Sequence, residues 1–194
     1  MKYCKTFKKH IDYEQALEDG LIYPNVSCCE REEESHFNID YSTKYLTFKT
    51  LKPTTFSFSY SGLSYSLNGG EWTELAANTP TPEIPACQSI RWKGTLMSAS
   101  STGIGTFSSD DKFAIEGNIM SLLYGDNFIG QTSLSGKNYV FYRIFKDTHV
   151  VNAEKLILLA TTLSSNCYYQ MFYGCTSLTT APELPATTLV SECY

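Results

Sequence analysis

The 194-residue sequence is poor in charge and has no excess of basic residues. Charged side chains make up 18% of the chain, the formal net charge is −5 and the pI is about 5.2. A nucleic-acid-binding protein needs a basic face for the phosphates, so this composition predicts no nucleic-acid partner. The hydrophobic content of 42% is too high, and the net charge too small, for a disordered acidic chain.

Long hydrophobic runs are also absent. The stretch 156–160 is among the longest and is far too short to span a bilayer, so we expect no direct membrane insertion. The first ten residues carry positive charge, but the apolar segment of a signal peptide does not follow them. The sequence therefore predicts a cytoplasmic chain, a mature chain, or one that reaches the outside by another route, such as inside a virus particle.

Motifs for metals and cofactors are missing as well. The seven cysteines include no CxxC pair, and His10, His36 and His149 lack ligand spacing. The acidic cluster Glu30–Glu34 has no glycine at a sharp turn, as a calcium loop would. We therefore expect no metal and no cofactor, and we interpret the acidic cluster as a solvated turn.

No catalytic constellation stands out, so we expect a protein without enzymatic activity. The remaining alternative is a thiol enzyme, with Cys28 or Cys29 as nucleophile and His36 as base. No orienting group or oxyanion site lies at a readable spacing from them, and we favour a structural role for these cysteines.

Three regions follow one another along the chain. The N-terminal segment 1–40 begins basic and ends acidic. Asp12 can cap a short helix over 12–19, which Gly20 ends, and strands at 25–29 and 35–39 then form a hairpin around the acidic turn.

The second region, 41–118, has the period-2 alternation of half-buried strands. Residues 54–60 and 63–67 alternate apolar with small polar side chains. Asn68-Gly69 then marks a hairpin turn, because both central residues of a type I′ turn need positive φ. The other expected strands are 71–75, 89–97, 103–107 and 113–115. Short strands at this spacing predict a small Ig-like β-sandwich.

The third region, 119–194, contains a repeat. Residues 158–168 match residues 184–194 at most positions, with an offset of 26. A looser copy lies upstream, where Phe145 corresponds to Phe172 and Val151 to Leu178. Periods of 20–50 residues predict stacked coils, so we expect a short, truncated solenoid.

The repeat has a predicted inner side and a predicted outer side. Residues 165–172 are expected to form a short helical return ended by Gly174, and 179–183 an extended face. The residues expected to form the repeat core are Leu163, Cys167, Met171, Phe172, Cys175, Leu178, Leu184, Leu189 and Cys193.

Cys167 and Cys193 occupy equivalent repeat positions. In-register coils would place them ~4.8 Å apart, which leaves a disulfide open. We favour a ladder of buried thiols.

Tyrosine and threonine dominate the repeat residues that are expected to lie on the surface. From residue 156 onward there is no Lys or Arg. The residues expected to bind a ligand are Tyr168, Tyr169, Tyr173, Thr179 and Thr180. Tyrosine offers rigid contact area with a polar tip, which suits recognition, although about half of these tyrosines are expected to point into the core.

The segment 171–185, MFYGCTSLTTAPELP, resembles the 26-residue leucine-rich repeat of BspA-like surface proteins of gut Bacteroidales and their phages. The segments 65–70 and 115–125 resemble the β domain that often precedes such repeats, and 23–27 with 36–38 resembles a leader of phage and prophage proteins. The repeat match covers about residues 140–194.

The resemblance implies adhesion or receptor recognition without a catalytic site. We expect a phage virion-associated protein, such as a fibre, tail or capsid decoration protein; the alternative is a BspA-like adhesin of the bacterial cell surface. The expected partners are a host surface glycan or protein, copies of the chain, and other virion or surface subunits. The expected location is the virion or the extracellular surface.

Overall fold

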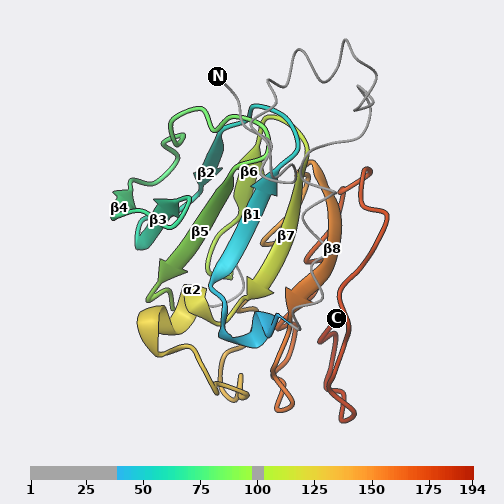
Figure 1. Ribbon diagram of the computed structural model, residues 1–194. Coiled ribbons are helices and arrows are strands. Elements are labelled where there is room, and N and C mark those ends of the chain that lie inside the picture. The colour runs from blue at the N-terminus through green and yellow to red at the C-terminus, as the bar shows by residue number, and fades with distance from the viewer. Residues whose placement is uncertain (1–38, 98–102) are drawn as a thin grey trace. The chain divides into compact units, whose positions relative to one another are not determined.

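A six-stranded mixed sheet is the largest element of the fold (Figure 1). The computed structural model describes residues 39–97 and 103–194, and Asp40–Tyr194 belong to one unit. The strand order is β4-β3-β5-β1-β7-β8, with antiparallel neighbours except for the parallel pair β7 and β8. The strands are β1 Leu46–Thr50, β3 Leu63–Leu67, β4 Trp72–Leu75, β5 Ser89–Gly94, β7 Phe113–Asn118 and β8 Val150–Ile157.

A second sheet of two strands covers the inner face of the first. It consists of β2 (Phe56–Phe58) and β6 (Phe107–Ser109), which are antiparallel. The ring centroids of Phe48 on β1 and Phe56 on β2 lie 5.1 Å apart, and those of Trp92 on β5 and Phe107 on β6 also lie 5.1 Å apart. These rings are all buried, so the centre of the core is aromatic.

Alternation along the strands separates this core from the outer face. On β5, Ile90 and Trp92 are fully buried, whereas Arg91 and Lys93 point to the opposite side and are partly exposed. The same alternation on β3 buries Leu63 and leaves Ser64 partly exposed. The outer face of the sheet is therefore polar.

Within the described residues, three short helices flank the sheet: η3 (Tyr41–Thr43), α2 (Ser121–Tyr124) and η5 (Gly125–Asn127). Ser121 begins α2 and joins it to two strands. Its buried hydroxyl accepts a hydrogen bond from the Leu46 amide and donates one to the Trp92 carbonyl. These bonds hold α2 at the ends of β1 and β5.

Two glycines meet strict backbone requirements. Asn68 and Gly69 have φ values of 49° and 79°, which confirms the predicted turn between β3 and β4. Gly117, on β7, has φ of 85°, and a Cβ at this position would lie 2.1 Å from the Tyr45 carbonyl oxygen. Only glycine fits there.

The mostly β fold agrees with the sequence-based expectation, whereas the sheet arrangement differs in detail. An Ig constant-type sandwich has two antiparallel sheets of four and three strands. Here the two sheets have six and two strands, and the larger one has a parallel pair at one edge. The expected strands at 54–60, 63–67, 71–75, 89–97 and 113–115 are present as β2, β3, β4, β5 and β7. The expected strand at 103–107 lies later, as β6.

Two strands were not predicted, and they change how the regions relate. They are β1 and β8. β8 belongs to the region expected to form a separate solenoid, yet it pairs with β7. The boundary expected at 118/119 therefore lies within one unit. The helix expected over 12–19, the hairpin around 30–34, and Cys28, Cys29, His10 and His36 lie outside the described residues.

Segments one repeat apart are joined by backbone hydrogen bonds. The amides of Tyr139, Phe141, Arg143, Phe145 and Asp147 donate to the carbonyls of the residues 26 positions later, over distances of 2.8–3.2 Å. Similar bonds join the last segment, where the amides of Asn166 and Tyr168 donate to the carbonyls of Ser191 and Cys193, 25 positions later. Residues 139–147 therefore stack on residues 165–173, and these stack on the final residues.

The stacked segments are successive tight turns, so the expected helical return over 165–172 is wrong. Positive φ recurs at every fourth residue in equivalent positions: Tyr139, Arg143 and Asp147 in one segment, Asn166, Gln170 and Gly174 in the next. A residue in the left-handed region cannot continue an α-helix. Hydrogen bonds between residues three apart close each turn instead.

The expected repeat core is only partly buried. Leu163, Cys167, Met171 and Cys193 are buried, and Phe172, Cys175 and Leu178 are half-buried. The expectation is wrong for Leu184 and Leu189, which are 55% and 63% exposed. Both lie in the last copy of the repeat, where no further segment stacks on them in the structure. Within residues 39–97 and 103–194, no helix has the length and apolarity needed to cross a membrane.

Candidate recognition surfaces

Aromatic side chains form columns across the stacked segments. Phe141 stacks on Tyr168 at 5.4 Å between ring centroids, and Tyr168 stacks on Tyr194 at 5.6 Å, with interplanar angles of 6° and 7°. This column lies in the core. A second column lies on the outer side, where Tyr142 stacks on Tyr169 at 5.9 Å. Side chains of equivalent repeat positions therefore face the same way.

The core column corrects one expected ligand-binding residue. Tyr168 is only 2% exposed, because Phe141 and Tyr194 cover its two faces. Its buried hydroxyl has no hydrogen-bond partner among the described residues. Burial raises the pKa of Tyr168 well above its ordinary value of 10.0. Tyr168 is thus a core residue.

The outer column belongs to a cluster that we call the tyrosine strip: Tyr142, Arg143, Tyr169, Gln170 and Tyr173. The guanidinium of Arg143 lies 4.8 Å from the ring centroid of Tyr142 and 5.7 Å from that of Tyr173. Its Nε donates a 2.6 Å hydrogen bond to the amide oxygen of Gln170. Tyr173 is 56% exposed and the other four are partly exposed. Two stacked segments thus present rigid rings held by one arginine.

The predicted threonines lie elsewhere on the repeat. Thr179 is exposed and Thr180 is partly exposed. Both lie alongside the edge strand β8. The Thr179 amide and hydroxyl donate to the Val151 carbonyl, and the Ala153 amide donates to the Thr180 carbonyl. Asn152 and Thr180 form an isolated parallel bridge. Residues 179 and 180 are thus extended and lie beside the outer edge of β8, in the segment 179–183 that was expected to be extended.

The fold largely encloses the thiols of Cys167, Cys175 and Cys193. The Cys167 thiol lies 3.5 Å from the Cys193 carbonyl oxygen, and both residues are buried. The Cys175 thiol donates to the Phe145 carbonyl at 2.8 Å. Burial raises the pKa of the Cys167 and Cys175 thiols, which disfavours the nucleophilic thiolate.

His149 contacts a serine in a way that suits structure better than catalysis. Its Nδ1 lies 2.9 Å from the Ser109 carbonyl oxygen and 3.4 Å from the Ser109 hydroxyl. A carbonyl oxygen only accepts, so Nδ1 carries the proton and is unavailable as a base toward that hydroxyl. In the described ranges, no three His, Cys, Asp or Glu side chains gather as metal ligands.

A second cluster lies on the outer face of the six-stranded sheet. We call it the Trp72 cluster: Tyr45, Trp72, Arg91, Lys93 and Asp126. The Lys93 ammonium lies 4.4 Å, and the Arg91 guanidinium 5.4 Å, from the Trp72 ring centroid. The rings of Tyr45 and Trp72 meet edge to face at 5.0 Å. Arg91 and Lys93 lie within the expected strand 89–97, and Trp72 within the expected strand 71–75, but the sequence did not bring Trp72 to them.

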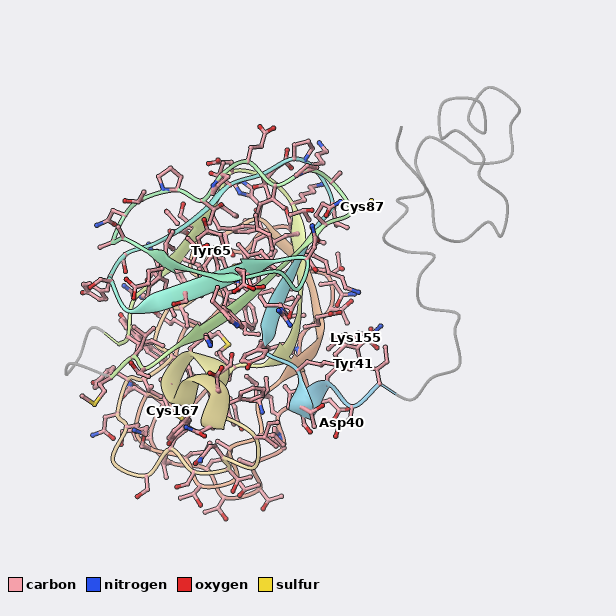
Figure 2. The ribbon with its side chains drawn as sticks, turned by 60° about the vertical axis from the view of Figure 1, so that its left-hand side comes forward. Asp40, Tyr41, Tyr65, Cys87, Lys155 and Cys167 are labelled. Carbon is pink, nitrogen blue, oxygen red and sulfur yellow. The ribbon has the colours of Figure 1, made fainter. Side chains whose placement is uncertain are left out.

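Asp126 ties part of this cluster together. Its carboxylate accepts hydrogen bonds of 2.8 Å from the Lys93 ammonium and 2.8 Å from the Tyr45 hydroxyl. The hydrogen bond from Lys93, followed by that from Tyr45, lowers the pKa of Asp126. Partial burial, followed by the hydrogen bond to Asp126, raises the pKa of Tyr45. A separate cation–π pair involves the edge strand β8, where the Lys155 ammonium lies 5.5 Å from the ring centroid of Tyr41 (Figure 2).

Comparisons with known proteins assign no family to the chain. No family model, curated protein or solved structure matches it.

Proposed function

We propose that the stacked segments of residues 139–194 are coils of a leucine-rich-repeat solenoid of the BspA-like type, and that the chain is a non-enzymatic recognition protein. The observation that carries this proposal is the backbone ladder that joins residues 26 positions apart, with aromatic columns in the same register. A solenoid places equivalent side chains in rows, and such rows form extended binding surfaces.

The tyrosine strip is the proposed ligand-binding surface. Tyr169 and Tyr173 keep their expected role, and Tyr142 and Arg143 extend the surface to the preceding coil. Stacked tyrosines lose little conformational entropy on binding, and their hydroxyls provide hydrogen-bond donors and acceptors. We propose a host surface glycan as the ligand, with a surface protein as the second candidate.

Binding to a glycan array tests this proposal. The wild-type chain is compared with the double variant Tyr169→Ala/Tyr173→Ala. The matched control is Tyr60→Ala, because Tyr60 is 49% exposed and lies outside the strip. We expect the double variant to lose about tenfold or more in affinity for any glycan bound, and the control to keep it. An equal loss in both variants, or no glycan bound by the wild type, contradicts the proposal.

The proposed setting is a phage virion, as a fibre, tail or decoration protein; a bacterial cell-surface adhesin is the second candidate. Peptide mass spectrometry on purified particles and on shaved cell surfaces separates the two. Peptides of this chain in stoichiometric amounts in the particles support the virion protein. That result excludes a chain that acts solely as a cell-surface adhesin. Peptides found only on the cell surface exclude the virion.

Contact with further subunits is part of the same proposal. Leu184, Leu189 and Val190 are exposed together near the end of the last coil, at 55%, 63% and 38%. Exposed apolar side chains close in sequence favour association. We expect the isolated chain to self-associate in light scattering at high concentration, and Leu189→Glu to weaken this. A stable monomer at high concentration contradicts the expectation.

A further inference from the structure

The outer face of the six-stranded sheet carries a cross-strand row with one unbalanced charge. Pairing brings Trp72 opposite Ser66, Ser66 opposite Arg91, and Arg91 opposite Thr47. Thr47 is in turn opposite Glu116 on β7. These residues come from five adjacent strands and point to the same side.

Two neighbouring cations on this face have carboxylate partners. The Lys49 ammonium lies 3.2 Å from a carboxylate oxygen of Glu116, and that of Lys93 lies 2.8 Å from one of Asp126. Arg91 lies between these pairs. No carboxylate of the described residues lies within ion-pair distance of its guanidinium.

The hydrogen bonds of Arg91 are also incomplete. Its Nη2 donates to the Ser66 hydroxyl at 3.0 Å, while its buried Nε has no acceptor among the described residues. The Ser66 hydroxyl in turn donates its proton to the Gly70 carbonyl at 2.6 Å. Its oxygen therefore faces Arg91 as an acceptor only. A guanidinium has five donors, and Ser66 is the one acceptor recorded for it among the described residues. Such a held, half-buried charge is costly without an anion.

The aromatic neighbours hold the guanidinium in place. Its Cζ lies 5.4 Å from the ring centroid of Trp72 and 5.7 Å from that of Tyr45. Cation–π contacts orient the planar group without neutralising its charge. The site therefore combines an oriented fork of donors with a partly exposed indole ring beside it.

We propose that Arg91 and Trp72 form a binding site for an acidic sugar, whose carboxylate pairs with the Arg91 guanidinium and whose ring packs on the Trp72 indole. The guanidinium fork matches a carboxylate in geometry and charge. One unpaired positive charge on a chain of net charge −5 suits a monoanion better than a polyanion. This site is separate in residues from the tyrosine strip and does not depend on the function proposed for the strip.

Titration with methyl β-D-glucuronide and methyl β-D-glucoside tests the proposal, because the two sugars differ only at C6, which is a carboxylate in the first and a hydroxymethyl group in the second. Binding is followed by NMR at the Trp72 indole N–H. The chain has only two tryptophans, and the buried Trp92 indole serves as the internal reference for folding. We expect saturable shifts at Trp72 with the glucuronide, and a dissociation constant about tenfold or more below that of the glucoside.

Variants assign the effect to Arg91. Arg91→Gln should remove the preference for the glucuronide. Lys137→Gln is the matched control, because the Lys137 ammonium also lies near a tyrosine ring, 5.5 Å from the ring centroid of Tyr124, but belongs to neither the strip nor the Trp72 cluster; it should leave the preference unchanged within about twofold. If the Trp92 signal shows that Arg91→Gln does not fold, Arg91→Lys replaces it. Lysine keeps the charge without the fork, and we expect weaker glucuronide binding by about fivefold or more.

Three results overturn the proposal. The first is equal affinity for the two sugars in the wild type. The second is an Arg91 variant that folds and keeps the full preference for the glucuronide. The third is N-acetylglycine, a monoanionic carboxylate, binding as tightly as the glucuronide, which would show that the site takes a carboxylate without a sugar ring.

Discussion

Leu158 and Leu184 occupy equivalent positions of the repeat, 26 residues apart, yet Leu158 is 3% exposed and Leu184 is 55% exposed. The next pair behaves in the same way: Leu163 is 8% exposed and Leu189 is 63% exposed. The same residue in the same local sequence is therefore a core residue in one copy and a surface residue in the next. Stacking of a following segment makes the difference.

This relationship predicts unequal effects of one substitution at matched sites. Leu158→Ala should lower the free energy of unfolding by ~2–4 kcal/mol, because it removes buried apolar surface and leaves a cavity. Leu184→Ala should change it by less than ~0.5 kcal/mol. Urea unfolding of both variants measures the difference. Similar values for the two would show that Leu184 is covered in solution.

Gly117 offers a second matched test. A Cβ there would meet the Tyr45 carbonyl oxygen at 2.1 Å, in addition to the strain of φ 85°. Gly136 has φ of 72° but no atom within 4 Å of such a Cβ. We expect Gly136→Ala to cost ~1 kcal/mol of stability and Gly117→Ala at least ~3 kcal/mol. Thermal unfolding decides, and equal costs would contradict the close approach of β7 to Tyr45.

The buried hydroxyl of Tyr168 predicts an unusual response to its removal. Because the hydroxyl has no partner among the described residues, Tyr168→Phe should leave the free energy of unfolding unchanged or raise it by up to ~1 kcal/mol at pH 7. Tyr169→Phe, on the outer column, is the control and should have no effect. A loss above ~1 kcal/mol for Tyr168→Phe would reveal a hydrogen bond to that hydroxyl.

The raised pKa of Tyr168 also predicts a loss of stability at alkaline pH. The folded state keeps the phenol protonated, while the unfolded chain releases the proton near its ordinary pKa of 10.0. The contribution of Tyr168 is thus complete below that pH and is lost as the pH rises toward the folded-state pKa. Urea unfolding between pH 8 and pH 11 should show this decline. The decline should be smaller in Tyr168→Phe, and an identical decline would refute the assignment.

Thiol labelling tests the enclosure of the cysteines. Cys167 and Cys193 are buried. A thiol probe should reach them only after denaturation, as peptide mapping would show. Rapid labelling of Cys167 or Cys193 in the folded chain is the result that would contradict this fold.

Local patterns in the sequence predicted those strands whose two faces differ clearly. Alternation revealed β2 and β3, and Asn68-Gly69 marked the turn after β3, because these signals depend on neighbouring residues alone. β8 was not predicted. Its pairing with β7 contains register shifts, so its burial does not alternate regularly along the strand.

The candidate sites depend on contacts that a local pattern does not contain. Tyr168 and Tyr169 are adjacent, yet Tyr168 is buried and Tyr169 is partly exposed, because they lie on opposite sides of a segment of tight turns. Trp72 reaches Arg91 only through the pairing of both β4 and β5 with β3. Register over two strand pairs therefore builds the Trp72 cluster, and no motif in the sequence marks it.

Hydrogen–deuterium exchange at the amides of Phe141, Arg143 and Phe145 tests the central claim most directly, because the tyrosine strip exists only if segments one repeat apart are stacked. These amides donate to carbonyls 26 residues later. We predict that they exchange far more slowly than in an unfolded chain, with protection approaching that of the Ile90 and Trp92 amides in the sheet. Exchange at unfolded-chain rates, with the sheet still protected, would contradict the stacked repeat and the recognition surface built on it.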